Sequence, residues 1–499
     1  MTPQQVLKQY WGYDDFRQGQ LTIINSILHG KDTLAIMPTG GGKSICFQVP
    51  ALILPGLTLV ISPLISLMKD QVDALTKRGV AAAYLSSAQT PQQQSAVYSD
   101  LRANTLRLLY LSPERLQSRR FQVAVRPLGI SLIVIDEAHC ISEWGHDFRP
   151  EFRQIADFIS QRKLRPTVAA FTATATPETQ HDIVQSLQLR QPFIQLSSFA
   201  RTNLGLQVIH CPTQFVQQMI LLKLLLKHRY QSGIIYVSSR QTAENLRKIS
   251  KGLLPFLSVE AYHAGLSADQ RTAIQERFIQ NKTELVFATN AFGMGIDKAN
   301  IRFVIHFHIP GSLEHYYQEV GRAGRDRDPS TTYLLYNENN LSIHLGMLGQ
   351  NKDLSDQQRK RQLFKLHSMR EFAKTSQCRS QFILQYFGEQ SELACEQCDR
   401  CLAQAGASKS PVIEPSFEIA FLQKLEEFRA TLAHSFNLSP TSIATDKVLY
   451  QLALVRPTTP RHASQLAGVG QGWIKQWWDR FEPLLSELGT ILSGMERSS

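Results

Sequence analysis

Residues 37–44, Met-Pro-Thr-Gly-Gly-Gly-Lys-Ser, constrain the fold of this chain more than any other stretch. They follow the apolar run Thr33–Ile36, which is typical of a buried strand, and they lead into Ile45–Leu52, which can begin a helix. Consecutive glycines let backbone N–H groups turn inward around phosphate oxygens, and the helix N-terminus adds its partial positive charge. A strand, a loop of this kind and a helix therefore predict an α/β domain that binds a nucleoside triphosphate.

The residue types in this loop predict their individual roles. Lys43 is expected to reach the terminal phosphates, and the Ser44 hydroxyl is expected to hold Mg²⁺. Met37 stands where the usual G-x-x-x-x-G-K-[ST] pattern has its first glycine, which favours helicase-type nucleotide motors over GTPases and kinases. The other nucleotide contacts are expected from the residues just before the lysine, which are Thr39, Gly40, Gly41 and Gly42.

Length and composition narrow the remaining possibilities. A chain of 499 residues is too long for one core, so about three or four domains are expected. No run of roughly 18 or more apolar residues occurs, so no membrane span is expected. Met1–Gln5 lacks the basic segment that opens an export signal, so export is not expected either. The net charge of +11 suits a polyanionic partner.

A second motif begins where the apolar run Leu132–Ile135 continues into Asp136, Glu137, Ala138 and His139. The end of a buried parallel strand places these acids at the carboxyl edge of the sheet, beside the phosphate loop. Asp136 is expected to hold Mg²⁺, and Glu137 is expected to orient or deprotonate the attacking water. His139 completes the motif as a further catalytic candidate.

The next stretch, residues 140–150, gathers aromatic and basic side chains in one loop. Such side chains stack on unpaired bases and pair with phosphates. Ser62 is a further candidate, because a small hydroxyl at the end of a strand suits a contact to the phosphate backbone. The segment Thr172–Thr176 is expected to relay changes between the nucleotide and this loop. The DNA-binding candidates in the loop are Trp144, His146, Phe148 and Arg149.

A second alternation of strands and helices follows without a phosphate loop, as expected for a duplicated partner lobe. The stretch Leu285–Asp297 reads as a strand followed by a glycine-punctuated turn, from which Gly295 and Asp297 are expected as further nucleotide contacts. Arg322 and Arg325 are three residues apart, which predicts that they share one helical face. From the second lobe they are expected to reach across a cleft to the triphosphate, since arginine stays charged and forks onto phosphate oxygens.

The order of these motifs closely resembles the RecQ family of DNA helicases within superfamily 2. The resemblance implies that Tyr13, Arg17 and Gln20 form an adenine pocket, that Arg325 is an arginine finger and that Arg322 senses phosphate. It also implies that ATP hydrolysis drives 3′-to-5′ translocation on single-stranded DNA and unwinding in DNA repair or recombination. Arg327 stands where the family usually has glycine, so the end of this motif is expected to be set differently.

Four cysteines near the end of the chain have metal-ligand spacing: Cys378, Cys395, Cys398 and Cys401. Two overlapping C-x-x-C steps and a fourth cysteine on a preceding helix can close a four-thiolate Zn²⁺ site. Because four thiolates leave no open coordination position, we expect a structural rather than a catalytic ion. The spacing matches the zinc subdomain that follows the motor in RecQ helicases.

In that family a winged-helix domain usually comes next, and the residues after Cys401 do not fit one. We expect a linker rich in Ala, Ser, Gly and Pro, and then helices that resemble an HRDC domain. The predicted fold is two tandem RecA-like α/β lobes with parallel sheets, followed by a zinc-binding helical module and a small all-α HRDC-like domain. The expected ranges are 1–205 and 206–340 for the lobes, 341–402 for the zinc module, 403–415 for the linker and 416–492 for the last domain.

These features predict an ATP-dependent DNA helicase that uses ATP, Mg²⁺ and Zn²⁺. Its expected partners are single-stranded and forked DNA, with single-strand-binding or recombination proteins as further candidates and no membrane. In a bacterium it would be cytoplasmic and associated with the nucleoid.

Two alternatives stay open. The first is an RNA helicase of the same superfamily, against which stand the aromatic loop and the four-cysteine module. The second is an ATP-gated DNA-binding or annealing translocase that unwinds weakly, because the winged helix is not found.

Overall fold

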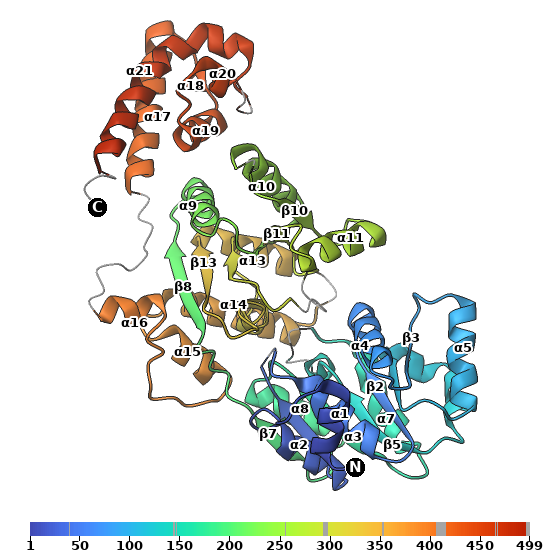
Figure 1. The fold of residues 1–499 in the computed structure, drawn as a ribbon. Coiled ribbons are helices and arrows are strands. Elements are labelled where there is room, and N and C mark those ends of the chain that lie inside the picture. The colour runs from blue at the N-terminus through green and yellow to red at the C-terminus, as the bar shows by residue number, and fades with distance from the viewer. Residues whose placement is uncertain are drawn as a thin grey trace.

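The computed structural model contains two α/β lobes, a helical module and a helical C-terminal domain (Figure 1). None of the helices in the described part of the chain is long and apolar enough to span a bilayer. The structure describes residues 1–38, 40–142, 145, 147–254, 256–292, 298–351, 354–405, 416–464, 466 and 468–495.

The first lobe is a seven-stranded parallel sheet with the strand order β3-β4-β2-β5-β6-β1-β7. Its central strands are apolar and buried on both faces, as parallel strands between two layers of helices must be. The strands are β1 (Thr33–Ile36), β2 (Leu57–Ile61), β3 (Ala82–Leu85), β4 (Leu108–Leu111), β5 (Ile130–Ile135), β6 (Thr167–Thr172) and β7 (Phe193–Leu196). The helices are α1 (Pro3–Trp11), α2 (Gln20–Leu28), α3 (Lys43–Ile53), α4 (Ile65–Lys77), α5 (Pro91–Arg102), α6 (Arg119–Val125), α7 (Gln154–Ser160) and α8 (Pro177–Ser186), with the 3₁₀ turns η1 (Pro113–Gln117), η2 (Ala138–Ile141) and η3 (Pro150–Arg153).

The second lobe repeats this construction with six parallel strands in the order β10-β11-β9-β12-β13-β8. Its first strand begins at Leu204, so the lobe starts slightly before the expected residue 206. The strands are β8 (Leu204–His210), β9 (Gly233–Tyr236), β10 (Val259–Tyr262), β11 (Leu285–Ala288), β12 (Phe303–His306) and β13 (Ser330–Tyr336). The helices are α9 (Gln214–Lys227), α10 (Arg240–Leu253), α11 (Ala268–Ile279) and α12 (Leu313–Val320), followed by η4 (Glu338–Asn340).

Helices alone make up the rest of the described chain. In the predicted zinc module α14 packs on α12 of the second lobe, and α16 packs on β8. Of the predicted linker, residues 406–415 lie outside the described residues. The module holds α13 (Leu341–Gln350), α14 (Asp356–Lys374), α15 (Arg379–Tyr386) and α16 (Asp399–Gln404), and the last domain holds α17 (Ser416–Phe436), α18 (Pro440–Ile443), α19 (Asp446–Val455), α20 (Pro460–Ala463) and α21 (Gln471–Met495).

The last domain packs on the second lobe. Its own core buries Trp477, Trp478 and Phe481 between the helices. The Tyr450 ring of α19 stacks on the Phe215 ring of α9, with 4.5 Å between ring centroids. Figure 1 shows this domain beside α9 and far from the first lobe.

Asp32 fixes the start of β1, the strand that leads to the phosphate loop. Its buried carboxylate accepts two hydrogen bonds from the Arg165 guanidinium, at 3.0 and 2.6 Å. It accepts two more from the backbone N–H groups of Val168 and Arg190, at 3.0 and 2.8 Å. One carboxylate therefore connects β1 to β6 and to the loop before β7.

Replacing Asp32 by alanine should lower the free energy of unfolding of the first lobe by about 3–5 kcal/mol, because four charge-assisted hydrogen bonds are lost. Urea unfolding followed by circular dichroism measures this change. The matched control is Asp157→Ala on the exposed side of α7, which should change the value by less than about 0.5 kcal/mol. Equal effects of the two substitutions would contradict this account of Asp32.

Candidate active site and metal centre

Three neighbouring strands of the first lobe carry the catalytic candidates to one edge of the sheet. Leu34 of β1 and Ile135 of β5 are both register partners of Ala170 in β6. The phosphate loop, the acidic motif and the Thr172 segment therefore leave the sheet side by side. The sequence prediction that the acids lie beside the phosphate loop is confirmed.

Lys43, the first residue of α3, and Glu137 form an ion pair across this edge, with Nζ 3.6 Å from Oε1. Each side chain is 15% exposed. Glu137 has a backbone φ of 50°, in the left-handed region that costs a residue with a Cβ about 1–2 kcal/mol. Its N–H donates to the Asp136 carboxylate at 3.0 Å, which supports this turn. Backbone strain of this kind is concentrated at functional sites.

The two adjacent acids differ in protonation. Burial and the neighbouring charge of Glu137 raise the pKa of Asp136 to about 6. Burial acts to raise the pKa of Glu137 as well, but the charges of Lys43 and Arg322 lower it below its usual value. Glu137 is therefore the stronger acid of the two and is ionised throughout the neutral range, while Asp136 takes up a proton near pH 6.

His139 connects the acids to β6. Its Nδ1 lies 2.9 Å from the Thr172 hydroxyl and 3.4 Å from Oε2 of Glu137. Burial lowers the pKa of His139 to about 4, so the ring is neutral at physiological pH. The Thr172 hydroxyl donates in turn to the Thr174 carbonyl at 3.1 Å. These contacts connect Glu137 to the Thr172–Thr174 part of the segment, and the relay to the aromatic loop stays a prediction.

Two of the three residues predicted to bind adenine hold the phosphate loop. Gln20 Nε2 donates to the carbonyls of Gly41 and Gly42 at 3.2 Å each, and Arg17 Nη1 donates to the Gly40 carbonyl at 2.5 Å. Gly42 has a φ of 79°, and a Cβ there would lie 2.4 Å from Gln20 Nε2, so only glycine fits. Tyr13 is 57% exposed. The contact of these residues with adenine stays a prediction. The sequence did not reveal that Gln20 and Arg17 support the phosphate loop.

The predicted helical face for Arg322 and Arg325 is wrong. Helix α12 ends at Val320, because Gly321 and Gly324 follow and Gly324 adopts a φ of 60°. Both arginines nevertheless reach the first lobe from these turns. Arg322 is buried in the lobe interface, where its charge acts on Glu137, and Arg325 Cγ lies 3.5 Å from the point where a Cβ on Gly40 would stand.

Arg327 adopts a backbone conformation that glycine favours. Its φ is 73°, in the left-handed region that glycine adopts freely. The end of the motif therefore forms a glycine-like turn in spite of the arginine. The difference expected from the arginine is backbone strain at this position.

A cavity lies where these groups meet. Glu137 and Asp147 of the first lobe line it, together with His315, Glu319 and Arg322 of the second. A site with one wall from each lobe changes shape when the lobes move. Five predicted site residues lie outside the described residues: Thr39, Trp144, His146, Gly295 and Asp297.

The four predicted metal ligands come together at the N-termini of α15 and α16. The sulfur atoms of Cys378, Cys395, Cys398 and Cys401 all lie within 4.8 Å of one another. A tetrahedral zinc ion with Zn–S bonds of ~2.3 Å needs sulfurs about 3.8 Å apart, so the donor set fits. The Cys398 thiol, as hydrogen-bond partner, lowers the pKa of Cys395 to about 4.

Four known families match consecutive parts of the chain. The DEAD/DEAH box helicase family matches residues 17–183, and the helicase conserved C-terminal domain matches residues 216–327. The RecQ zinc-binding family matches residues 341–402, and the HRDC domain matches residues 418–482. Only residues 403–417 lie between the last two matches, too few for a further domain of about 100 residues.

Similar proteins point the same way. An ATP-dependent DNA helicase RecQ of Pasteurella multocida is 44% identical over 402 residues, which cover 80% of this chain and 62% of that protein. One of the same name from Synechocystis sp. is 41% identical over 342 residues, which cover 67% of this chain and 71% of that protein. The chain belongs to the RecQ family. It spans about two thirds of the relatives from Pasteurella multocida and Bacillus subtilis, with 62% and 66% of their lengths.

Solved structures of low identity support the fold alone. Mss116p bound to ssRNA and AMP-PNP has a TM-score of 0.59 at 15% identity, over 91% of this chain and 89% of that one. The helicase MrfA bound to DNA has a TM-score of 0.56 at 18% identity, over 67% of this chain and 51% of that one.

In this RecQ-family chain the aromatic loop folds back on the acidic motif. The backbone N–H of Arg149 donates to the Cys140 carbonyl at 2.8 Å, which ties the loop to η2. The Arg149 guanidinium bonds Asp147 at 3.0 Å and the Pro63 carbonyl at 3.5 Å, and Phe148 lies under the Arg153 guanidinium. Ser62 is 1% exposed, and its predicted DNA contact stays a prediction.

Lys365 of α14 is a functional candidate that the sequence did not reveal. It is 5% exposed and donates at 2.8 Å to the carbonyl of Gly145, in the aromatic loop. It also lies 3.4 Å from Glu314 of α12, and burial lowers the pKa of Lys365. One ammonium group thus joins the zinc module to both lobes. In the sequence Lys365 stands in a basic stretch, which is typical of solvent-exposed charges.

The RecQ-family cysteine cluster should hold one zinc ion per chain, measured by atomic absorption on the purified protein. Cys398→Ser should remove most of the metal and lower the melting temperature, because a structural zinc site contributes directly to folding. Cys211→Ser, at a buried cysteine in the second lobe, is the control and should leave the metal content unchanged. A metal-free wild-type protein with the same melting temperature would contradict the assignment.

Proposed function

We propose that this protein is an ATP-dependent DNA helicase that translocates 3′ to 5′ on single-stranded DNA and unwinds duplexes in DNA repair or recombination. The observation that carries the proposal is the interlobe cleft, where Lys43 and Glu137 of the first lobe face Arg322 and Arg325 of the second. Relatives with the name ATP-dependent DNA helicase RecQ support ATP as the fuel and DNA as the track. The polarity is that of the family.

The hydrolytic mechanism follows from the resting contacts. A bound triphosphate takes over Lys43, which releases Glu137 from its ion pair to orient and deprotonate the attacking water. Arg325, already against the phosphate loop, and Arg322, beside Glu137, neutralise the charge that develops on the transferred phosphoryl group.

Mg²⁺ and the adenine base of ATP have candidate binding residues as well. The Ser44 hydroxyl and the Asp136 carboxylate offer oxygen ligands, which Mg²⁺ prefers. The ion would neutralise phosphate charge when bound. The exposed ring of Tyr13 offers a face on which adenine can stack, and Gln20 offers amide hydrogen bonds.

Coupling to DNA runs through the aromatic loop. A DNA strand that binds at Phe148 and Arg149 would displace η2 through the hydrogen bond from the Arg149 N–H to the Cys140 carbonyl. His139 lies on η2 and contacts both Glu137 and Thr172, so this displacement would be transmitted to the catalytic carboxylate. Lys365 carries the same movement to the second lobe and the zinc module. Single-strand-binding or recombination proteins are the partners that this activity would serve.

The decisive test is the unwinding of a 3′-tailed duplex, with ATP hydrolysis followed in parallel. The wild type should unwind it and should leave a 5′-tailed duplex intact. Lys43→Ala should lose roughly 100-fold or more in both assays, and Arg325→Ala about 1000-fold in hydrolysis. Lys77→Ala, on the exposed end of α4, is the control and should match the wild type. Unwinding by Lys43→Ala would contradict the proposal.

Two observations favour other functions, and the same assays separate them. The short interval between the zinc and HRDC matches favours a translocase or annealing protein that unwinds weakly, which would hydrolyse ATP on DNA without separating strands. A protein named putative ATP-dependent RNA helicase from Acanthamoeba polyphaga mimivirus is 38% identical over 79% of this chain. RNA that stimulates hydrolysis as strongly as DNA would favour that function.

Magnesium affinity should depend on pH through Asp136. Because the pKa of this carboxyl is raised to about 6, it is protonated at lower pH and must then lose a proton to bind the ion. The apparent Mg²⁺ affinity should fall about tenfold for each pH unit below 6 and stay constant above it. Mg²⁺ titrations by calorimetry measure this. Asp136→Asn should bind more weakly with no such slope, and an equal slope in that variant would contradict the assignment.

A further inference from the structure

The chain segment between the two lobes lies against the turn that carries Arg322 and Arg325. The Arg201 guanidinium, from this segment, donates to three backbone carbonyls of the turn. The distances are 3.4 Å to Gly321, 3.0 Å to Ala323 and 3.1 Å to Gly324. These carbonyls follow the C-terminus of α12, where a cation is favoured by the helix dipole.

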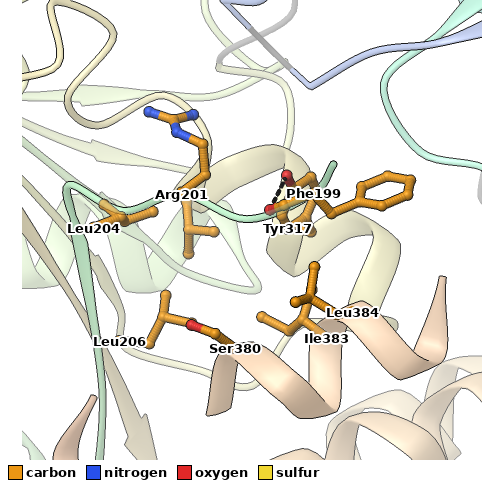
Figure 2. A pocket seen from close by; sticks show the side chains of 9 residues that line it. Phe199, Arg201, Leu204, Leu206, Tyr317, Ser380, Ile383 and Leu384 are labelled. Atoms are coloured by element: carbon orange, nitrogen blue, oxygen red, sulfur yellow. Dashed lines mark hydrogen bonds between the residues drawn. The ribbon is translucent and has the colours of Figure 1, made fainter. Parts of the chain in front are cut away.

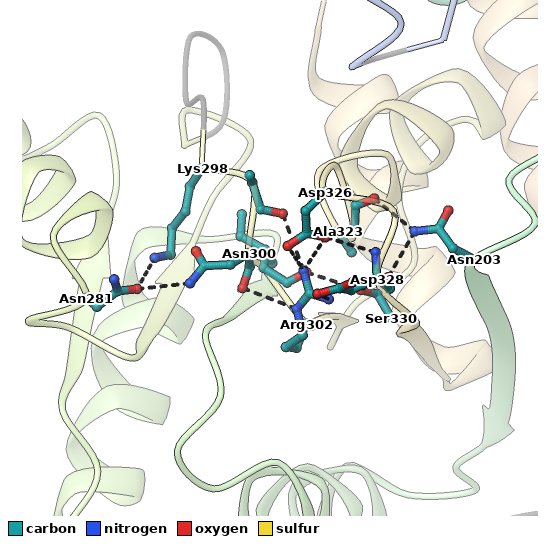
Figure 3. A network of polar contacts seen from close by, with 12 residues as sticks. Asn203, Asn281, Lys298, Asn300, Arg302, Ala323, Asp326, Asp328 and Ser330 are labelled. Atoms are coloured by element: carbon teal, nitrogen blue, oxygen red, sulfur yellow. Dashed lines mark hydrogen bonds and ion pairs between the residues drawn. The ribbon is translucent and has the colours of Figure 1, made fainter.

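Asn203, two residues further along the segment, holds the same turn (Figure 3). Its amide donates to the carbonyls of Gly324 at 2.9 Å and Asp328 at 3.0 Å. A Cβ on Gly324 would lie 2.4 Å from the Asn203 amide nitrogen, so glycine is needed here for space as well as for its positive φ. The turn is therefore shaped around two side chains of the interlobe segment.

The segment itself is anchored before it reaches the turn. The Phe199 carbonyl accepts a hydrogen bond from the Tyr317 hydroxyl of α12 at 2.8 Å, close to Arg201 (Figure 2). The Phe199 ring stacks on Phe387 of the zinc module, with 4.5 Å between centroids. Glu389 of the module accepts from the Phe199 N–H at 2.8 Å and from the Ser198 hydroxyl at 2.6 Å. Arg201 thus extends from a fixed piece of backbone.

Neither side chain belongs to the nucleotide site, yet each holds the backbone that presents both arginines to it. Arg322 and Arg325 have long side chains with many rotamers, so their placement depends on where the turn is held. Small displacements of a group that acts on the reacting phosphate are costly, and about 1 Å can lower a rate about 100-fold.

We propose that Arg201 and Asn203 are positioning residues that set where Arg322 and Arg325 meet the triphosphate. The proposal rests on the proposed hydrolysis of ATP in this cleft. Both residues belong to the covalent connection between the lobes. Because Phe199, just before them, is held by α12 and by the zinc module, the two supports stay with the arginine turn when the angle between the lobes changes.

The first test compares Arg201→Gln with the wild type. DNA-stimulated kcat should fall about 10–100-fold, while the Kd for a fluorescent ATP analogue and for a single-stranded oligonucleotide change less than about twofold. Arg201→Lys should recover only part of the loss, since an ammonium lacks the planar fork that reaches several carbonyls. Asn203→Ala should behave like Arg201→Gln. Arg277→Gln, whose arginine pairs with Glu260 elsewhere in the second lobe, is the control.

A double-mutant cycle tells positioning from general damage. If Arg201 acts through Arg322 and Arg325, Arg201→Gln should lower kcat by a smaller factor in the Arg325→Ala background than in the wild type. Additive losses would overturn the proposal, as would a wild-type kcat in Arg201→Gln.

Hydrogen exchange gives a readout that does not need hydrolysis. Residues 321–326 should exchange faster in Arg201→Gln, while β13 keeps its protection. An inactive wild type with this exchange pattern would contradict the proposed function and leave the structural role of Arg201 supported. Unchanged exchange in the turn would overturn the positioning role.

Discussion

The ion pair between Lys43 and Glu137 is the contact on which the nucleotide site depends. Both groups are largely buried, and a buried charge without a partner is strongly destabilising. Lys43 begins α3 and Glu137 follows β5, so the pair holds the phosphate loop against the acidic motif while no triphosphate is present. In the mechanism that we propose, the ligand that replaces Glu137 as the partner of Lys43 also frees the carboxylate that activates water. Binding and catalytic activation would then be linked through one ammonium group.

Much of the fold could be predicted because its signals are local. The run Thr33–Ile36, the glycines and Lys43 follow one another directly, and the same holds for Leu132–Ile135 and its acids. Parallel topology then brings these two points together without further information. The cysteine cluster was equally accessible, since ligand spacing alone restricts a tetrahedral site.

The rest could not be predicted, because it depends on contacts between distant parts of the chain. Arg201 meets a carbonyl 122 residues away, and Lys365 meets one 220 residues away. Neither is marked by periodicity, and both had the character of solvated charges. The prediction for Arg322 and Arg325 failed for a local reason: their spacing suits a helix, but the glycines beside them end it. Residues from the interlobe segment hold the turn from which the arginines reach the cleft.

The contacts of Lys365 make the zinc module and the two lobes one folded unit. Residue 341 is where the match to the RecQ zinc-binding family begins, and a sequence comparison would divide the chain there. At that division Glu314 would keep a buried carboxylate without its ammonium partner, and the Gly145 carbonyl would lose its donor. The zinc module therefore completes the interior of the motor that precedes it. The boundary at residue 341 separates two sequence families, whereas buried contacts of the folded molecule cross it.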